Sequence, residues 1–590
     1  MSFISVSASD AAAVPLEELH TLAKKAGFDI ESSSVDEKDY HNFHASFTLV
    51  SKTLANLPSY IDPRLSPVET TQPRTFNHPS PTSNPLNAWS YKAEQSLIAT
   101  SPTSQILAGK KIALKANVSV AGCPLDIGTS PLMFEGGEYP ISTIDATVVR
   151  RLLLAGAGIV GTGTCENMSL SGISTTAHTG PVHNAWAKGY ATGGSSSGVG
   201  SLVSASDVAQ LSQQDKLPFP LSPDWLEHCS SDGVDCAIGG DQGGSIRLPS
   251  HYSGIYGLKP TKGLVPYTGI MSLSASIDHT GPMTRNLPDL ITMLSVIAGA
   301  DGIDQRQGPR VPLPADLPAY SDLLASWQQS QSLSGTWTPT SAARGLRIGV
   351  LHEGTLTHDM SPHIESAFSS AVSRFETLGA TVVPVSVPQH LIAPSIWSVI
   401  TRSSLVRNLR NSPPDLLSYP MPGVRLRRPD QWMYEYFRRR NPAVINALLN
   451  ATWLDSAEGV EAERKAFGLV AELTSAYDSV FEANKLDVLV LPVTKSAAPR
   501  IPEGVLGGED GTTITAAEVT RDMMGVTANT CPFNLSGHPA LSLPMGWVET
   551  EDGKGRLPAG LQIVGRHFGE LNIFKAAMAW EIGGKGMESL

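Results

Sequence analysis

Apolar residues recur along the chain at two spacings, and these spacings predict where helices and strands alternate. Helical spacing comes first, over residues 16–26 and again over residues 39–57. From residue 110 onward, short apolar runs that suit buried strands alternate with helix-length segments. The predicted strands are residues 111–114, 158–160, 234–238, 346–351, 380–384, 486–491 and 561–564, and predicted helices include residues 146–155, 363–378 and 571–580. This alternation predicts an α/β fold, in which helices cover both faces of a central, mostly parallel or mixed β-sheet.

Segments rich in proline and small polar residues suggest how the chain is divided. Residues 61–85 have this composition, which is typical of a linker or an irregular wrap. We therefore expect a small helical N-terminal region with its linker over residues 1–90, and a main domain over residues 91–590. Within the main domain, residues 304–340 predict a long surface crossing, and residues of about 395–475 predict a helix-rich insert or cap.

Composition and charge narrow the classes of function. The chain has 590 residues, of which 41% are hydrophobic and 17% are charged, as in globular proteins. A formal net charge of -12 without a long basic run argues against nucleic-acid and membrane partners. No apolar run approaches the roughly 18 residues of a spanning helix, and the start lacks the basic segment of a signal peptide. The five scattered cysteines suggest neither disulfides nor a metal site, so we expect a reducing, cytoplasmic location.

One glycine motif is a false lead. Residues 156–161 fit the pattern G-x-G-x-x-G. A dinucleotide-binding fingerprint requires a strand before this motif and a helix after it. Here the predicted helix at residues 146–155 comes first and the predicted strand at residues 158–160 follows, so we expect no nucleotide site.

Three segments carry candidate chemistry, although each alone has an ordinary explanation. Lys115 ends an apolar strand, where a lysine commonly extends its ammonium toward solvent. Residues 192–200, Thr-Gly-Gly-Ser-Ser-Ser-Gly-Val-Gly, taken alone suggest a flexible loop, but the apolar residues that follow predict a tight entry to a helix N-terminus. Residues 238–249, Ile-Gly-Gly-Asp-Gln-Gly-Gly-Ser-Ile-Arg-Leu-Pro, follow a predicted strand and taken alone suggest a turn.

The third segment also has the composition of an oxyanion hole. Its glycines let the chain turn tightly, so that the peptide N–H groups from Gln242 to Ser245 can point at one oxygen. Asp241 and Arg247 flank the turn, and we expect them to pair and brace it.

Taken together, the three segments resemble the amidase signature family of serine amidohydrolases. That family joins a Gly-Gly-Ser-Ser-Gly-Gly-type loop to a Gly-x-Asp-x-Gly-Gly-Ser-[Ile/Val]-Arg turn, which residues 193–198 and 239–247 match. Its Lys-Asp-Asn pattern appears here as Lys115-Ala116-Asn117. The resemblance runs from about residue 84 to the C-terminus, with further matches at residues 256–261, 278–283, 529–533 and 538–544. The Gly-Gly-Asp-Gln-Gly-Gly-Ser motif is similar to the branch of bacterial nitrile-pathway amidases, which also begins with a small helical domain.

The resemblance implies the amidase signature fold and a Ser-Ser-Lys triad. Ser245 would be the nucleophile, Ser195 would bridge from an unusual cis peptide, and Lys115 would be the base. A serine hydroxyl is a weak nucleophile until a base takes its proton. Lysine can be that base only when neutral, which burial in an apolar shell favours.

The same resemblance implies a substrate site and a reaction. The residues it places at the substrate are Gln242, Gly243, Gly244, Ser169 and Leu170. For Leu170, structural packing is the alternative interpretation. The implied reaction cleaves linear C–N bonds of small-molecule amides to a carboxylate and ammonia or an amine through an acyl-enzyme, with carbamates (urethanes) or esters as further substrates. It needs no metal and no cofactor, and homodimers are common in the resembling branch.

The sequence departs from the family pattern at three places. Ala116 stands where the pattern has aspartate, and Ser197 stands where it has glycine. The interval from Lys115 to Ser195 fits the family, but the interval from Ser195 to Ser245 is longer than usual. We attribute the extra length to a surface insertion at residues 210–230.

Three alternatives stay open. One is a glutaminase-type component of an amidotransferase assembly, although the N-terminal region and the acidic charge argue against it. A second is a Ser–His arrangement using His279 or His251. The third is a catalytically dead scaffold.

Overall fold

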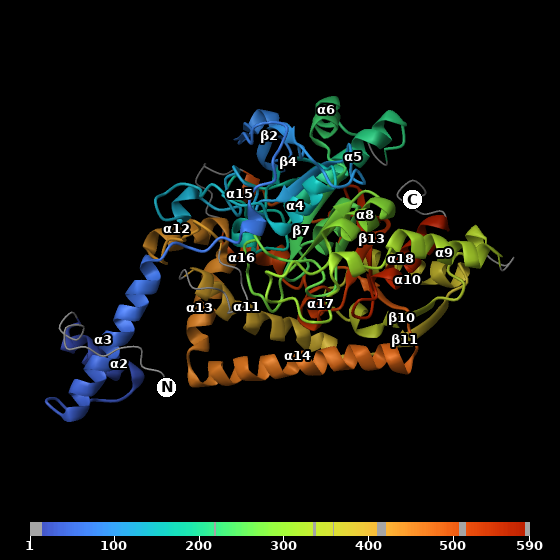
Figure 1. Ribbon diagram of the computed structural model, residues 1–590. Coiled ribbons are helices and arrows are strands. Elements are labelled where there is room, and N and C mark those ends of the chain that lie inside the picture. Colours follow the sequence, from blue (N-terminus) through green and yellow to red (C-terminus); the bar gives the residue numbers. More distant parts are fainter. Residues whose placement is uncertain are drawn as a thin grey trace. The chain divides into compact units, whose positions relative to one another are not determined.

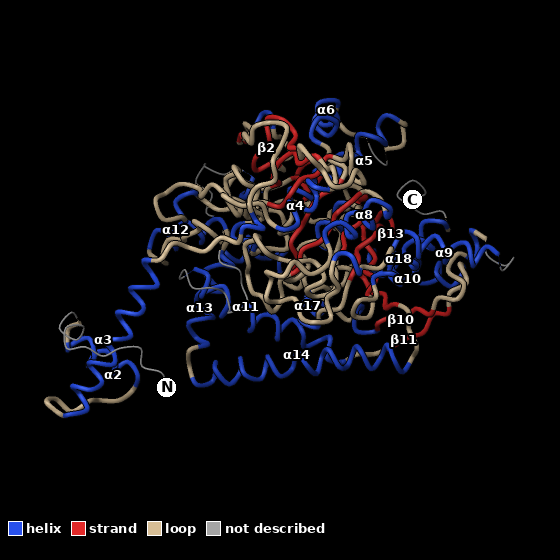
Figure 2. The backbone as a smooth tube through the Cα atoms, viewed as in Figure 1, coloured by secondary structure: helices blue, strands red, loops and turns tan. Residues whose placement is uncertain are grey.

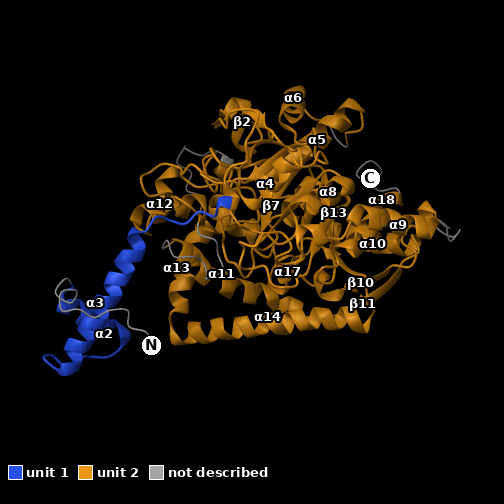
Figure 3. Cartoon of the chain, in the orientation of Figure 1, with its two compact units in different colours: residues 1–63 blue, residues 64–590 orange. Residues whose placement is uncertain are grey.

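The computed structural model describes residues 14–217, 220–333, 338–357, 359–409, 421–506 and 515–583. The chain divides into two compact units, Met1–Pro63 and Arg64–Leu590, which Figure 3 colours separately. The second unit contains the whole twelve-stranded sheet and the three residues of the expected triad.

The described residues of the first unit, 14–63, contain two helices, both where helical spacing predicts them. They are α2 (Leu16–Ala26) and α3 (Val35–Asn56). α3 begins after Ser34, whose hydroxyl accepts a hydrogen bond from the N–H of Glu37 and so satisfies a free donor of the first turn. His20 of α2 contacts the Glu37 carboxylate, with Nε2 and Oε1 2.6 Å apart. This contact holds the two helices together.

The second unit is built on a twelve-stranded mixed sheet. Its strands are β1 (Phe76–Asn77), β2 (Trp89–Leu97), β3 (Lys111–Lys115), β4 (Gly158–Gly163), β7 (Cys236–Asp241), β8 (Tyr256–Lys259), β9 (His279–Thr284), β10 (Arg347–Leu351), β11 (Thr381–Val385), β12 (Val488–Pro492), β13 (Ala540–Glu549) and β14 (Arg556–Val564). Their order is β1-β2-β4-β3-β7-β9-β8-β13-β14-β12-β10-β11. β3 pairs in parallel with β4 and β7, and β10 pairs in parallel with β11 and β12. The other pairs are antiparallel, and β5 (His183–Asn184) and β6 (Ala187–Ala191) form a separate ribbon.

Helices enclose this sheet on both sides (Figure 2). They are α4 (Thr147–Leu154), α5 (Ser197–Gln213), α6 (Pro223–Asp232), α7 (Arg247–Ser253), α8 (Leu287–Ile297), α9 (Tyr320–Leu333), α10 (Pro362–Thr377), α11 (Ala393–Leu409), α12 (Gln431–Arg440), α13 (Pro442–Leu454), α14 (Ala457–Ala483), α15 (Glu503–Leu506), α16 (Ala516–Thr520), α17 (Cys531–Ser536) and α18 (Glu570–Ile582). Figure 1 shows the long helix α14 along the outside of this unit.

Neighbouring strand residues pack on opposite faces, as the two-residue period of a strand requires. Ile112 and Leu114 of β3 belong to one apolar core with α4, α8, α10 and α18, whereas Ala113 packs with α5 on the other face. In the same way Val488 of β12 joins the first core, and Leu489 packs with α11, α13 and α14. Both faces of the sheet are therefore buried, which explains why the strand sequences appear as continuous apolar runs.

The predicted mixed α/β architecture is confirmed. Every strand predicted from residue 110 onward overlaps an observed strand, and the three predicted helices are α4, α10 and α18. The antiparallel strands β8, β9 and β13 were not predicted. β9 contains Pro282 and β13 contains Pro544 and Gly546, residues that suggest loops when judged by composition alone.

Three segments that were expected to be irregular or inserted contain helices. Residues 210–230 hold the end of α5 and the start of α6, with residues 218–219 outside the described part. Residues 304–340 contain α9, so this surface crossing is partly helical. Residues 395–475 contain most of α11, all of α12 and α13 and most of α14, with residues 410–420 outside the described part.

Two further expectations concern the whole chain. All five cysteines are buried and unpaired, which confirms that they form no disulfide framework. Among the described residues, no helix combines the length and the apolar character that crossing a bilayer requires.

Candidate active site

The lysine at the end of β3 points into the protein interior. Lys115 lies in the sheet between β4 and β7, and its side chain is fully buried. Its Nζ donates to Ser195 Oγ at 2.7 Å and to the carbonyl oxygen of Gly240 at 3.4 Å. The alternative explanation, a lysine that extends to solvent from a strand end, is therefore wrong.

Burial sets the protonation of this lysine. It lowers the pKa of Lys115 from an ordinary 10.5 to about 8, because loss of water penalises the ammonium form. Nearby acidic groups, including the Asp241 and Glu166 carboxylates, favour the ammonium and limit the shift. A usable fraction of neutral amine therefore exists at mildly alkaline pH, as a general base requires.

The serine loop connects the lysine to the glycine turn. α5 begins directly after the loop, which confirms the prediction of a tight helix entry, and the Gly194–Ser195 peptide is cis. The N–H of Ser196 donates to the carbonyl oxygen of Ser245 at 3.3 Å. The Ser196 hydroxyl donates to the carbonyl oxygen of Gly240 at 3.1 Å. Lys115, Ser195 and Ser245, which are far apart in the sequence, thus meet at the ends of β3 and β7.

A buried carboxylate behind the serine loop was missed by the sequence analysis. The N–H of Glu166 donates to the Ser195 carbonyl oxygen at 3.1 Å, and its carboxylate accepts from the Thr176 N–H at 2.9 Å and from the Ser197 hydroxyl at 3.2 Å. Burial raises the pKa of Glu166 to about 7, despite these hydrogen bonds. Ser197 stands where the family pattern has glycine, and its hydroxyl makes a hydrogen bond to Glu166 that a glycine could not make. No sequence signal marked Glu166, because its partners come from other loops.

The turn that carries Ser245 is braced by a buried ion pair, as expected. Arg247 Nε and Nη2 donate to the two oxygens of Asp241 at 3.0 and 2.9 Å, and both side chains are fully buried. Arg247 also donates to Gln562 Oε1 and Asn534 Oδ1, each at 2.7 Å. The arginine holds the pKa of Asp241 far below its ordinary value despite burial. The pair thereby fixes the turn to α17 and β14.

Breaking this pair is expected to destabilise the second unit. Arg247→Met would leave the Asp241 carboxylate buried and without its cation, and such losses typically cost about 3–5 kcal/mol. The urea midpoint of unfolding, followed by tryptophan fluorescence, should fall clearly. The exposed pair of Arg464 and Glu461 on α14 provides the matched control, because Arg464→Met should leave the midpoint in place. Equal midpoints for Arg247→Met and the wild type would contradict the bracing role.

One of the four expected oxyanion donors is already used. The N–H of Gly244 donates to Asp241 Oδ1 at 2.7 Å, in a backbone conformation with φ +136° that favours glycine. The carbonyl oxygen of Gln242 accepts from Trp397 Nε1 at 2.7 Å, which holds that peptide in place. A side chain at Gly243 would collide with the Trp397 ring. The N–H groups of Gln242, Gly243 and Ser245 thus remain as candidate donors.

A small cavity opens beside Ser245. Its volume is about 160 Å³, below the roughly 300–1,000 Å³ of sites for drug-sized ligands. The predicted substrate residues Ser169, Leu170, Gln242 and Gly243 line it together with Ser245, whereas Gly244 does not. The other lining residues are Ser171, Gly172, Leu273, Trp397, Arg402, Ala443, Met523, Val526 and Thr527.

Two of these lining residues come from helix α11. Trp397 and Arg402 lie on α11, more than a hundred residues beyond the nucleophile turn. Sequence motifs did not identify them, since the helix is placed over the turn only by tertiary packing. The sequence indicated these two residues only indirectly, through the prediction of a helix-rich insert or cap in this region.

The structure excludes the Ser–His alternative for both histidines. The ring of His251 donates through Nε2 to the carbonyl oxygen of Ser496 and accepts through Nδ1 from the N–H of Gly560. His279 donates through Nδ1 to the carbonyl oxygen of Ile277, and its Nε2 has no partner among the described residues. Neither ring bonds to Ser245.

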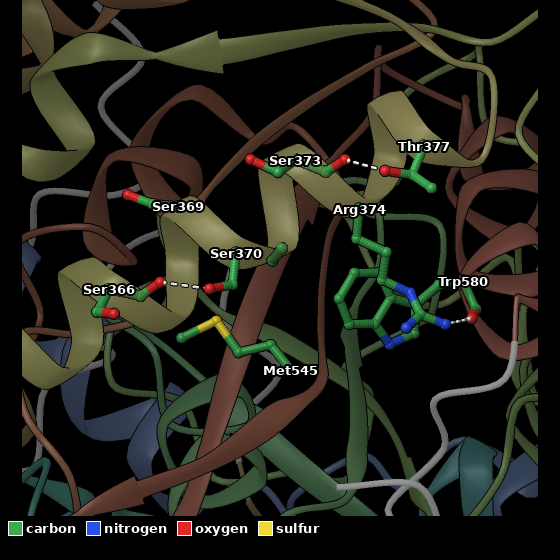
Figure 4. A pocket seen from close by; sticks show the side chains of 9 residues that line it. Ser366, Ser369, Ser370, Ser373, Arg374, Thr377, Met545 and Trp580 are labelled. Atoms are coloured by element: carbon green, nitrogen blue, oxygen red, sulfur yellow. Dashed lines mark hydrogen bonds between the residues drawn. The ribbon is translucent and has the colours of Figure 1, made fainter.

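A larger hollow on the surface does not compete as an active site. It measures about 550 Å³ and lies over α10, where serines and Arg374 line it (Figure 4). The Ser370 and Thr377 hydroxyls donate to backbone carbonyls of their own helix. Arg374 stacks on Trp580. These two hydroxyls therefore have structural partners, and none of the described residues that line the hollow is a histidine, a lysine or a carboxylate that could act as a base.

One group in the described part of the chain has ligand types that suit a metal ion. Asp478, His538 and His567 place one candidate ligand atom each within 4.8 Å of the others. His538 Nε2 lies 3.1 Å from Asp478 Oδ1, and burial lowers the pKa of His538 to about 4. A neutral His538 that donates Nε2–H to the carboxylate explains this contact without an ion. None of the three lines the cavity beside Ser245.

Comparisons with known proteins extend over nearly the whole second unit. The family described as Amidase matches residues 84–212 and 229–574, so the gap between the two matches falls within the expected insertion. An enantioselective amidase of Rhodococcus rhodochrous is 33% identical over 85% of this chain and 84% of its own length. One component of the glutamyl-tRNA(Gln) amidotransferase of Natronomonas pharaonis is 31% identical over 80% of this chain and 95% of its own. The structure of 6-aminohexanoate cyclic dimer hydrolase complexed with substrate shares the fold, with TM-score 0.58 and 23% identity over 80% of this chain and 84% of that one.

Proposed function

The chain belongs to the amidase signature family of hydrolases that act on amides, and from this premise we propose that it cleaves linear C–N bonds of small amides through a Ser-Ser-Lys triad. The observation that carries the proposal is the 2.7 Å hydrogen bond from buried Lys115 Nζ to Ser195 Oγ, next to the turn of Ser245. This contact joins a lysine of lowered pKa to the hydroxyl that must relay a proton.

In the first half of the reaction, neutral Lys115 takes a proton from Ser195, which takes the proton of Ser245. The Ser245 oxygen then attacks the amide carbonyl carbon, and negative charge develops on the carbonyl oxygen. The N–H groups of Gln242, Gly243 and Ser245 are the donors available to stabilise it. Loss of one such donor typically costs about 2.7–4 kcal/mol of barrier.

The second half releases two products. The tetrahedral intermediate collapses with cleavage of the C–N bond, and the leaving nitrogen receives the proton carried by Lys115 and Ser195. Water then attacks the acyl-enzyme, and the same pair removes its proton and returns one to Ser245. The products are a carboxylate and ammonia or an amine.

Finer features of the proposal concern substrate and setting. Small-molecule amides are the first substrate class, and carbamates (urethanes) or esters are further candidates because the same acyl-enzyme chemistry serves them. The resemblance of the Gly-Gly-Asp-Gln-Gly-Gly-Ser motif supports a relation to nitrile-pathway amidases. The cysteine pattern supports a cytoplasmic setting, and a homodimer remains a proposal from the resembling branch.

A substrate panel tests the proposed function. Purified enzyme is given aliphatic amides, aromatic amides and alkyl carbamates, and the release of ammonia or amine is measured. We expect turnover of at least one small amide, with a Ser245→Ala variant as the inactive reference. Release of product at the same rate by both proteins would rule out the triad, and labelling of Ser245 by a fluorophosphonate would rule out a dead scaffold.

The proposed base also predicts the pH dependence. Since Lys115 must be neutral and its pKa is about 8, log kcat/KM for an uncharged amide should rise with unit slope below about pH 8 and level off above it. Glu166, with a pKa of about 7, also titrates in this range, so Glu166→Gln is the control. If the rise of log kcat/KM near pH 8 persists in this variant, the titrating group is Lys115. A flat profile from pH 6 to 9 would contradict a lysine base.

A second candidate function is that of a glutaminase-type component in an amidotransferase assembly. It is favoured by relatives such as the Natronomonas pharaonis protein, which match most of the chain. Glutamine carries an ammonium group, however, and none of the described residues that line the cavity is acidic. Hydrolysis of glutamine, and copurification with a partner that accepts ammonia, would favour this candidate over the first.

A further inference from the structure

The cavity beside Ser245 contains one guanidinium group among its described lining residues. It belongs to Arg402 of α11, which is partly buried. Its Nη1 donates to Thr401 Oγ1 at 3.1 Å, and Thr401 Oγ1 in turn donates to the carbonyl oxygen of Trp397 at 2.9 Å. These bonds orient the guanidinium from one side. Its Nε is buried and has no hydrogen-bond partner among the described residues.

Two arginines that are more deeply buried, Arg247 and Arg306, show what Arg402 lacks, whereas the partly buried Arg151 and Arg374 donate to backbone carbonyls. Arg247 is fully buried and pairs with Asp241 through two hydrogen bonds. Arg306 is nearly as buried and pairs with Asp304 and Asp278. Both charges are thus compensated by carboxylates. For Arg402 no ion pair is recorded with any described residue, and none of the described residues that line its cavity is acidic.

Partial burial of a cation is costly when no counter-charge is present, because the group gives up part of its hydration without compensation. Such a group is expected where a ligand supplies the missing partner. The partner that suits a guanidinium is a carboxylate, which accepts two parallel hydrogen bonds from its planar fork.

We propose that Arg402 binds a carboxylate of the substrate, so that the preferred amides of this enzyme are small acid amides. This inference rests on the proposed function, since the carboxylate binds in the cavity that Ser245 also lines. The cavity of about 160 Å³ limits the distance between carboxylate and scissile amide to a few bonds. Monoamides of short dicarboxylic acids combine both groups. Amino-acid amides fit less well, because their ammonium finds no acidic residue there.

The test compares matched substrates in matched variants. Succinamate and glutaramate carry the carboxylate, and succinamide and glutaramide are their uncharged counterparts. For the wild type, kcat/KM should be higher for the acids, and Arg402→Gln should lower the ratio of acid to neutral substrate about 10–100-fold, the range of a charge-assisted hydrogen bond. The loss should fall mainly on KM. Arg407→Gln, an exposed arginine on the same helix, should leave the ratio unchanged.

A binding measurement separates this inference from the proposed function. Calorimetric titration of succinamate into Ser245→Ala should show binding that weakens when Arg402→Gln is added. If the wild type hydrolyses no amide but succinamate binds through Arg402, the proposed function fails and the carboxylate site stands. If amides are hydrolysed but Arg402→Gln changes neither the substrate ratio nor the binding of succinamate, the inference is overturned and the proposed function stands.

Discussion

Replacing Ser245 by alanine is expected to lower kcat/KM for small amides by about 10⁴–10⁶-fold, as losses of a serine nucleophile do in other hydrolases. The variant lacks the oxygen that forms the acyl-enzyme. Its fold should persist, because the turn is held by backbone bonds and by the Asp241–Arg247 pair rather than by the Ser245 hydroxyl. Residual hydrolysis would come from polarisation of the bound carbonyl alone.

Mass spectrometry after fluorophosphonate treatment checks the same assignment by covalent chemistry. The wild type should gain one adduct on Ser245, and Ser245→Ala should gain none. Ser250→Ala is the matched control, since Ser250 is a buried serine of α7 whose hydroxyl donates to the Ile246 carbonyl oxygen. Its labelling and turnover should be retained. An adduct on Ser195 instead, with full labelling of Ser245→Ala, would reverse the proposed roles.

Replacing Lys115 by methionine is expected to remove activity and to raise stability. Loss of a general base typically costs about 10²–10⁴-fold in rate. The folded-state pKa of about 8 lies below the ordinary 10.5, so the buried ammonium destabilises the fold below about pH 8. The buried ammonium lowers the free energy of unfolding by an amount on the order of 3 kcal/mol at pH 7. This loss vanishes as pH rises from about 8 to 10.5. The lost hydrogen bond to Ser195 offsets part of the gain.

Thermal and urea unfolding of Lys115→Met at pH 7 and at pH 10 would show whether the gain shrinks with pH, as this linkage requires. Lys111 is the matched control, because it lies exposed at the other end of the same strand. Lys111→Met should change neither activity nor stability. A Lys115→Met protein that is active, or that is less stable than the wild type at both pH values, would contradict a lysine base whose pKa is lowered by burial.

The parts of the fold that were predicted from sequence are those with strong local patterns. β3, β4, β7 and β12 are buried on both faces and therefore appear as apolar runs. β9 and β13 were missed, because their prolines and glycines resemble loop composition and only pairing with neighbouring strands makes them extended. Sheet order could not be predicted either, since local spacing carries no information about which strands pair.

The candidate site divides in the same way. Lys115, Ser195 and Ser245 were predicted because the apolar strand and the two glycine-rich segments that contain them together resemble motifs of the amidase signature family. Glu166 and Arg402 were not found, because a lone acidic or basic residue has no local signature. Only burial, and the presence or absence of a counter-charge, distinguishes them from surface residues.

The sequence by itself determined the class of fold and predicted the ion pair that braces the turn of Ser245, because both depend on residue types at short range. The three triad candidates came from the resemblance of its motifs to the amidase signature family. The tertiary structure alone decided that Lys115 points inward, that the Gly244 N–H is already bonded and that α11 brings Arg402 to the cavity. Those outcomes depend on which segments pack together and on the water they exclude. Electrostatic properties such as a lowered lysine pKa or an unpaired guanidinium arise only from that packing.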